Sequence, residues 1–328
     1  MFDTRITKLF GIKYPIIGGG MQFLSRAGLV SAISNAGGLG LIPAAMFPEL
    51  DDLRKEIRLT KTLTKKPFGI NLTLFQHPRG VTIEQYIDVI LDEGIKIVET
   101  AGRSPEPYIK KLKDNGVIIM HKTPAVRFAK TAERVGVDAI AILGMEGAGH
   151  PGMDDVTSMV LIPLAAETLK IPVVAAGGIS NARSFLAALS LGAEGILMGT
   201  RFAITQESPA HPKIKEALVQ APETATALLE RSLGNPIRAL KNKAAQTILE
   251  LETKGATSDE LLPYIRGEQG KKAWIGGEID AGVVSIGEVV GLVHNIPTVK
   301  EVIDSIVSEA QTLLEHLTNI SGTKQAKR

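Results

Sequence analysis

Residues 172–202 read PVVAAGGISNARSFLAALSLGAEGILMGTRF and contain two short apolar segments separated by a longer amphipathic one. The segments 172–176 and 195–199 are rich in β-branched and aliphatic residues, which is typical of strands covered on both faces. The segment 182–190 has helical periodicity and stops before Gly192, a common type of helix-terminating residue. Two parallel strands joined by a helix are the repeating unit of α/β proteins.

The same strand–helix unit recurs along most of the chain. We predict further strands at 15–19, 39–42, 68–72, 95–99, 117–121 and 138–142, which brings the number to eight. They lie roughly 20 to 35 residues apart, as a repeated βα unit requires. The fold class that follows is α/β, a (β/α)8 TIM barrel. An open doubly wound sheet is the alternative, but residues 18–28 read GGGMQFLSRAG rather than the glycine pattern of a dinucleotide-binding turn.

The periodicity changes after the eighth strand. Residues 205–291 show no convincing strand pattern and contain helical segments, which we place at 214–220, 224–231, 239–251 and 258–265. This stretch is too long for one loop. We therefore predict a barrel domain formed by residues 1–204 and 292–328, with a helical lid at 205–291 covering its mouth. A final helix at about 298–317 is expected to return to the barrel wall.

The composition excludes several classes of function. The 328 residues include 37 basic and 35 acidic ones, a net charge of +2, so no electrostatic footprint for nucleic acid is present. The absence of cysteine removes disulfides, thiolate metal sites and cysteine nucleophiles, and fits a reducing compartment. No signal-peptide core or membrane-length apolar run is found. We expect a cytoplasmic protein that acts on a small molecule without membrane contact, with a homodimer as one candidate assembly.

Barrel enzymes carry their chemistry on the loops that follow the strands. The seventh strand leads into Ala176, Gly177 and Gly178, and the eighth into Gly199 and Thr200. Glycines at these two positions free backbone amides to converge on an anion, and the helix that follows directs its positive dipole end to the same point. The two loops predict a binding site for a phosphorylated ligand.

Other loops supply side chains that suit a flat heterocycle. Met21 and Gln22 follow a glycine run after strand one, where a ring can approach the backbone closely. Asn71 ends strand three and offers both a donor and an acceptor, or else fastens its own loop. Lys122 follows strand five, where it could form a Schiff base or stabilise negative charge on a bound ring. Its neighbour His121 is expected to be packed within the barrel wall.

The loop after strand six carries the most distinctive titratable group. Residues 146–152 read EGAGHPG, so glycine and proline shape a tight turn around His150. Histidine titrates near neutral pH and can act as an acid, a base or a hydrogen-bond donor to a substrate. We predict that His150 is the catalytic residue. No histidine pair has metal-ligand spacing, so no metal site is expected.

Taken together, the motifs GGGMQ, SNAGGLG, FGINLT, HKTPAV, EGAGHPG, AAGGI and MGTRF resemble the nitronate monooxygenase (2-nitropropane dioxygenase) family of FMN-dependent barrels. GGMQ and GHPG are most similar to its NAD(P)H:quinone reductase branch. The resemblance implies oxidation of alkyl nitronates with oxygen, or of NAD(P)H as a cosubstrate with a quinone acceptor. The FMN-dependent enoyl-acyl-carrier-protein reductases share several of these motifs and are the alternative.

The resemblance also implies a role for each of these residues. It assigns the FMN phosphate to the loops of strands seven and eight, the isoalloxazine and ribityl contacts to strands one, three and five, and the ring and substrate contacts to strand six. The phosphate residues are Gly177, Gly178, Gly199 and Thr200, and Ala176 before them is also expected to bind the cofactor. The isoalloxazine and ribityl contacts are Met21, Gln22, Asn71 and Lys122. Ala148 and Gly149 lie close to the ring, with His150 facing the substrate.

Two readings from other classes stay open. A lyase or aldolase could form a Schiff base through Lys122 and bind a phosphorylated substrate at the same loops. A flavin-binding protein without turnover would keep the pocket and make no catalytic use of His150. A dehydrogenase of the inosine-monophosphate type is excluded, because its chemistry requires a cysteine.

Overall fold

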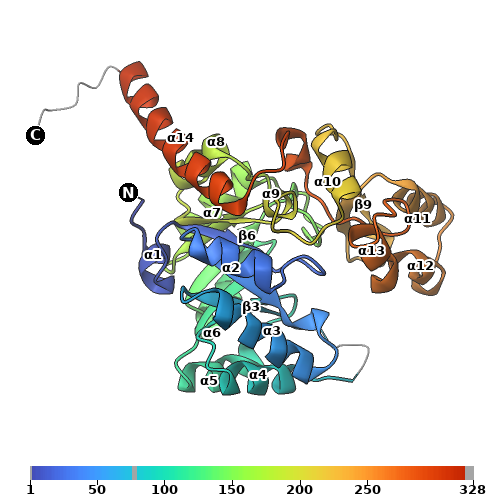
Figure 1. Ribbon diagram of the computed structural model, residues 1–328, viewed down its shortest axis with the longest axis horizontal. Helices are drawn as coiled ribbons and strands as arrows, with labels where there is room; N and C mark the ends of the chain where they lie inside the picture. Colours follow the sequence, from blue (N-terminus) through green and yellow to red (C-terminus); the bar gives the residue numbers. More distant parts are fainter. Residues whose placement is uncertain (1, 76–79, 322–328) are drawn as a thin grey trace, which may run out of the picture.

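The computed structural model describes residues 2–75 and 80–321, and its centre is a closed barrel of parallel strands in the order β1 to β8 (Figure 1). The barrel prediction is therefore confirmed. The strands are β1 (Ile16–Gly18), β2 (Leu39–Pro43), β3 (Phe68–Thr73), β4 (Ile97–Ala101), β5 (Ile118–Thr123), β6 (Ala139–Leu143), β7 (Val173–Ala176) and β8 (Gly195–Met198).

Helices cover the outside of the barrel, as the apolar outer faces of the strands require. They are α2 (Ala27–Asn35), α3 (Leu50–Leu63), α4 (Ile83–Asp92), α5 (Glu106–Asp114), α6 (Val126–Val135), α7 (Ser158–Thr168), α8 (Ala182–Ser190) and the short α9 (Thr200–Ala203), with a 3-10 turn, η1, at Ala44–Met46. The last helix, α14 (Val299–Ile320), packs against α8 and α2, so the predicted return to the wall is confirmed. None of the described helices is long and apolar enough to cross a membrane.

The inside of the barrel is a packed core at its amino-terminal end. Inward-facing residues such as Leu41, Met120 and Val174 form one buried cluster with Ile6 and Phe10 of α1 (Arg5–Phe10). Helix α1 therefore closes the end of the barrel opposite the strand carboxyl ends. Only the carboxyl-terminal end is left for a site, as in other barrels of this type.

The segment after β8 differs from the helical lid that the sequence predicts. It holds α10 (Pro212–Val219), α11 (Lys243–Thr253), α12 (Ser258–Ile265), α13 (Gly267–Trp274) and the 3-10 turns η2 (Arg231–Leu233) and η3 (Glu288–Leu292). It also holds an antiparallel hairpin of β9 (Thr226–Leu229) and β10 (Ile237–Leu240). In Figure 1 this part projects to one side of the barrel.

The hairpin corrects two of the predicted helices. The helix placed at 224–231 is wrong, and the one placed at 239–251 begins only at Lys243, after the N-cap Asn242. Leu229 and Ala239 instead turn inward onto α11 and form a small core with Ile248. Packing against this core outweighs the helical propensity of the segment TATALLE.

Strands β4 and β5 end two residues beyond their predicted ends. β4 runs to Ala101 and β5 to Thr123, so Glu99 and Lys122 lie within strands rather than at or after their ends. Both side chains therefore point into the barrel, because alternate residues of a strand share a face.

Candidate active site

A cavity of about 690 Å3 opens at the carboxyl ends of the barrel strands. Every residue predicted to bind the cofactor or substrate lines it: Met21, Gln22, Asn71, Lys122, Ala148, Gly149, His150, Ala176, Gly177, Gly178, Gly199 and Thr200. The structure thus brings these residues together from six strand ends. Their individual roles remain predictions.

One end of the cavity is built from backbone. Gly177 and Gly178 have φ of 89° and 73°, a left-handed pair that directs successive amides to one side. Within the described residues neither amide has a protein acceptor. A Cβ on Gly177 would stand 2.9 Å from the carbonyl oxygen of Gly144, so the close approach of these loops requires glycine. Two unpaired amides side by side fit a phosphate group.

The floor of the cavity carries a lysine. The Lys122 ammonium lies 3.4 Å from Oε1 of Glu99, whose side chain is fully buried. Asn71 donates from Nδ2 to Oε2 of the same carboxylate at 2.5 Å. Lys122 is thus neither an exposed lysine nor a free amine, and Asn71 does more than fasten its own loop. Behind them, His121 is buried in the wall as predicted, with Nδ1 2.9 Å from the Thr100 hydroxyl.

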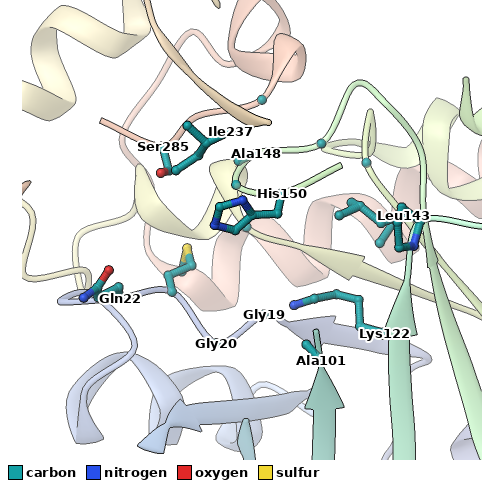
Figure 2. A pocket seen from close by; sticks show the side chains of 18 of the residues that line it. Gly19, Gly20, Gln22, Ala101, Lys122, Leu143, Ala148, His150, Ile237 and Ser285 are labelled. Atoms are coloured by element: carbon teal, nitrogen blue, oxygen red, sulfur yellow. The ribbon is translucent and has the colours of Figure 1, made fainter. Parts of the chain in front are cut away.

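His150 lies above Lys122. Figure 2 shows both side chains extending into the same space, with the Gly19–Gly20 backbone close by. Nδ1 of His150 is 3.2 Å from the carbonyl oxygen of Pro236. A carbonyl oxygen only accepts, so Nδ1 carries the proton and a neutral His150 has an unprotonated Nε2.

The surroundings of His150 keep it neutral. Its pKa is lowered below the ordinary 6.5, first because burial disfavours the imidazolium and also because Lys122 is positive, against the raising effect of its backbone hydrogen bonds. His150 is nevertheless exposed to solvent in the open cavity, so the lowered pKa reflects the protein atoms packed beside the ring and not exclusion of water from it. An imidazole in this state accepts a proton or a hydrogen bond from a substrate.

The hairpin of the insertion holds the loop that carries His150. Gly149 and Arg238 exchange two backbone hydrogen bonds, of 2.7 and 3.3 Å, and form an antiparallel bridge. The buried Arg238 side chain donates to the carbonyl of Met145 at 2.8 Å and to the hydroxyl of Thr226 at 3.0 Å. It also pairs with Glu288 at 2.9 Å. The insertion is therefore part of the site and not only a cover.

Sequence reasoning missed several lining residues. Ile237 and Ser285 come from the insertion and face the cavity (Figure 2), and Glu146 lies beside Gly178. The sequence gave no signal for Ile237 and Ser285, because the insertion has no repeating pattern, whereas Glu146 begins the loop EGAGHPG and was assigned no role. Glu99, which lies behind Asn71 and Lys122, did carry a signal in the sequence, because it is the one acid in the largely apolar segment IKIVETA.

The outer rim is apolar. Phe75, Phe128 and Met153 line the cavity entrance and are each close to half exposed. The guanidinium of Arg127 lies 4.5 Å from the Phe128 ring centre. Exposed apolar side chains gathered at a cavity mouth are typical of a binding surface.

Comparison with known proteins places the chain in context. The family model described as nitronate monooxygenase matches residues 3–309. A probable nitronate monooxygenase of Staphylococcus saprophyticus is 33% identical, over 80% of this chain and 83% of its own length. The (3aS,4S,5R,7aS)-5-hydroxy-7a-methyl-1-oxo-octahydro-1H-indene-4-carboxyl-CoA dehydrogenase of Rhodococcus jostii is 30% identical, over 94% and 95%. Among solved structures, FabK from Thermotoga maritima is similar with a TM-score of 0.91 and 35% identity, covering 98% of this chain and all of its own.

Proposed function

The chain belongs to the nitronate monooxygenase family of oxidoreductases, in which flavin dependence is general, and we propose that it binds FMN in the cavity described above. FMN, when bound, takes up an electron pair from one substrate and releases it to another. We propose NAD(P)H or an alkyl nitronate as the donor, and a quinone or oxygen as the acceptor. The observation that carries this proposal is the pair of Gly177 and Gly178 amides, without an acceptor among the described residues, in the same cavity as His150.

The residues present fit FMN. The cavity volume lies within the range of cofactor pockets. Gly177 and Gly178, with Gly199 and Thr200, would hold the phosphate. The glycine run before Met21 would lie against the ring: a Cβ on Gly20 would stand 2.5 Å from Asn71, so the backbone here can only be glycine. Gln22, Ala148, Gly149 and Ala176 complete the enclosure.

Two side chains would act on charge and protons. The Lys122 ammonium on the cavity floor would stabilise negative charge developing on the ring. His150 would accept a proton at Nε2, because its Nδ1 proton is committed to Pro236. Among the three roles open to a histidine, namely acid, base and hydrogen-bond donor, the geometry therefore favours the base. Such a base would serve if the substrate enters as the neutral nitroalkane: Nε2 of His150 would take the proton from the carbon beside the nitro group, and the nitronate formed would be the electron donor.

A second candidate is an oxidoreductase of acyl thioesters. Relatives 30% identical over almost the whole chain carry the name of a carboxyl-CoA dehydrogenase, and the chain also resembles enoyl-acyl-carrier-protein reductases. The apolar rim at Phe75, Phe128 and Met153 suits an acyl substrate larger than a nitroalkane.

A Schiff-base lyase is less well supported. Both carboxylate oxygens of Glu99 lie within 3.5 Å of Nζ of Lys122, so this nitrogen is engaged by a buried acid and is not free to attack a carbonyl carbon. A cytoplasmic location and a homodimer remain proposals, and light scattering of the purified protein would test the second.

The experiment begins with the visible spectrum of the purified protein, which should show bound oxidised flavin. The protein is then mixed anaerobically with NADH, NADPH, propyl-2-nitronate or butyryl-CoA, and the flavin absorbance is followed. Bleaching by the nitronate, or bleaching by NADH or NADPH that a quinone but not crotonyl-CoA reverses, supports the main proposal. Bleaching by butyryl-CoA, or reoxidation of the NAD(P)H-reduced flavin by crotonyl-CoA, supports the second. A colourless protein that does not bind added FMN refutes both.

A further inference from the structure

We propose that Glu99 is a positioning residue for Lys122, and that the two charges together set the reduction potential of the bound flavin. This inference rests on the proposed function, since it concerns the same cavity. No part of the electron transfer described above uses Glu99.

The burial of Glu99 needs an explanation. It lies in the middle of β4, level with Asn71 of β3 and Met120 of β5, and its side chain has no exposed surface. Burial of a carboxylate is strongly unfavourable unless the charge is paired and hydrogen-bonded. Other inward positions of the barrel, such as Leu41 and Val174, are apolar. An acid at this level of the core is thus a departure from the local pattern.

The partners of Glu99 are all residues of the cavity floor. Asn71 donates to Oε2, and the Lys122 ammonium lies 3.4 Å from Oε1 and 3.5 Å from Oε2. Oε1 makes no hydrogen bond within the described residues, so its interaction with Lys122 is purely electrostatic. The carboxylate thereby holds one end of a flexible four-carbon side chain from below, while the cavity lies above it.

The pairing also changes the charge that a ring in the cavity meets. Lys122 alone would present a full positive charge, which favours an anionic reduced ring. Glu99 behind it offsets much of that charge in a poorly solvated place, where electrostatic interactions are strong. The pair should therefore hold the potential of the flavin below the value that an unpaired lysine would produce.

The test uses the FMN-loaded protein and measures the midpoint potential by equilibration with redox dyes. We expect Glu99→Gln to raise the equilibrium constant for two-electron reduction about tenfold, or about 30 mV. Lys122→Met should shift it in the opposite direction, because it leaves the carboxylate uncompensated. The double variant, which removes both charges, should return close to the wild-type value, since the two residues act as one unit.

Glu56→Gln is the matched control. Glu56 is a buried acid that pairs with Arg26 on the outside of the barrel, away from the cavity. It should lower stability and leave the potential unchanged. Glu99→Asp keeps the charge, so its potential should fall between wild type and Glu99→Gln.

The experiment distinguishes failure of the proposed function from failure of the role of Glu99. A wild-type protein that binds no FMN refutes the proposed function. A wild-type protein that binds FMN, with Glu99→Gln and Glu56→Gln equally without effect on the potential, refutes only the role of Glu99. A double variant whose potential stays as far from the wild-type value as that of either single variant would overturn it as well.

Discussion

The left-handed glycine pair after β7 allows a sharp test of the phosphate site. Gly177 and Gly178 both have positive φ, so alanine at either position should destabilise the apoprotein by about 1–2 kcal/mol. Their surroundings differ. A Cβ on Gly177 would lie 2.9 Å from the oxygen of Gly144 and 3.2 Å from the amide of Gly147, whereas one on Gly178 would meet only the Glu146 side chain, at 3.7 Å.

The atoms that crowd Gly177 are backbone and cannot rotate away. We therefore expect Gly177→Ala to lose about 1–3 kcal/mol more than Gly178→Ala, in the range of overpacked cores. The backbone movement needed to accommodate the Cβ added by Gly177→Ala would also displace the amides from the phosphate. FMN affinity should therefore fall more than tenfold in Gly177→Ala and much less in Gly178→Ala. Urea unfolding of the apoproteins and FMN fluorescence titration measure the two quantities. Equal losses in both variants would refute the reasoning.

Three further predictions concern histidines and the hairpin. His150→Ala should lower turnover at least about a hundredfold with little change in FMN affinity. In the wild type the acidic limb of kcat/KM should lie below pH 6.5, because the pKa of His150 is lowered; a limb above pH 7 would contradict this. Arg238→Met should lower the free energy of unfolding by about 3 kcal/mol, since it orphans two acceptors, whereas Arg231→Met, which breaks an exposed pair, should lose less than about 1 kcal/mol. Burial lowers the pKa of His121 to about 4, so the unfolded chain binds its proton first as pH falls. Stability should then decrease by about 3 kcal/mol between pH 6.5 and 4, and His121→Gln should flatten that slope in urea titrations.

The barrel could be predicted because its strands are buried on both faces and so read as apolar runs. The run VVAA predicts β7 almost to the residue, whereas the shift of β4 from 95–99 to Ile97–Ala101 depends on register with β3 and β5. The hairpin could not be predicted, because β9 is made of good helix formers whose pairing partner follows a turn with two left-handed residues, Glu230 and Gly234. The pairing of β9 with β10 depends on residues beyond the turn, so the local sequence of β9 does not predict it.

The site was predictable where one residue type has one geometric use. Glycines after the last two strands indicate an anion site wherever the fold is known, and His150 stands out in a short shaped loop. The tautomer of His150 was not predictable, because it depends on Pro236, a residue 86 positions away. The role of Glu99 was not predictable either, because it depends on Lys122, which the neighbouring strand β5 places beside it.

The backbone bridge between Gly149 and Arg238 has a consequence for protein engineering. An insertion grafted from a relative would bring its own hairpin, but the edge to which it must pair belongs to the recipient's barrel. Exchange of substrate preference between such enzymes should therefore succeed only when the insertion and the loop after β6, which carries Gly149 and His150, are transferred together.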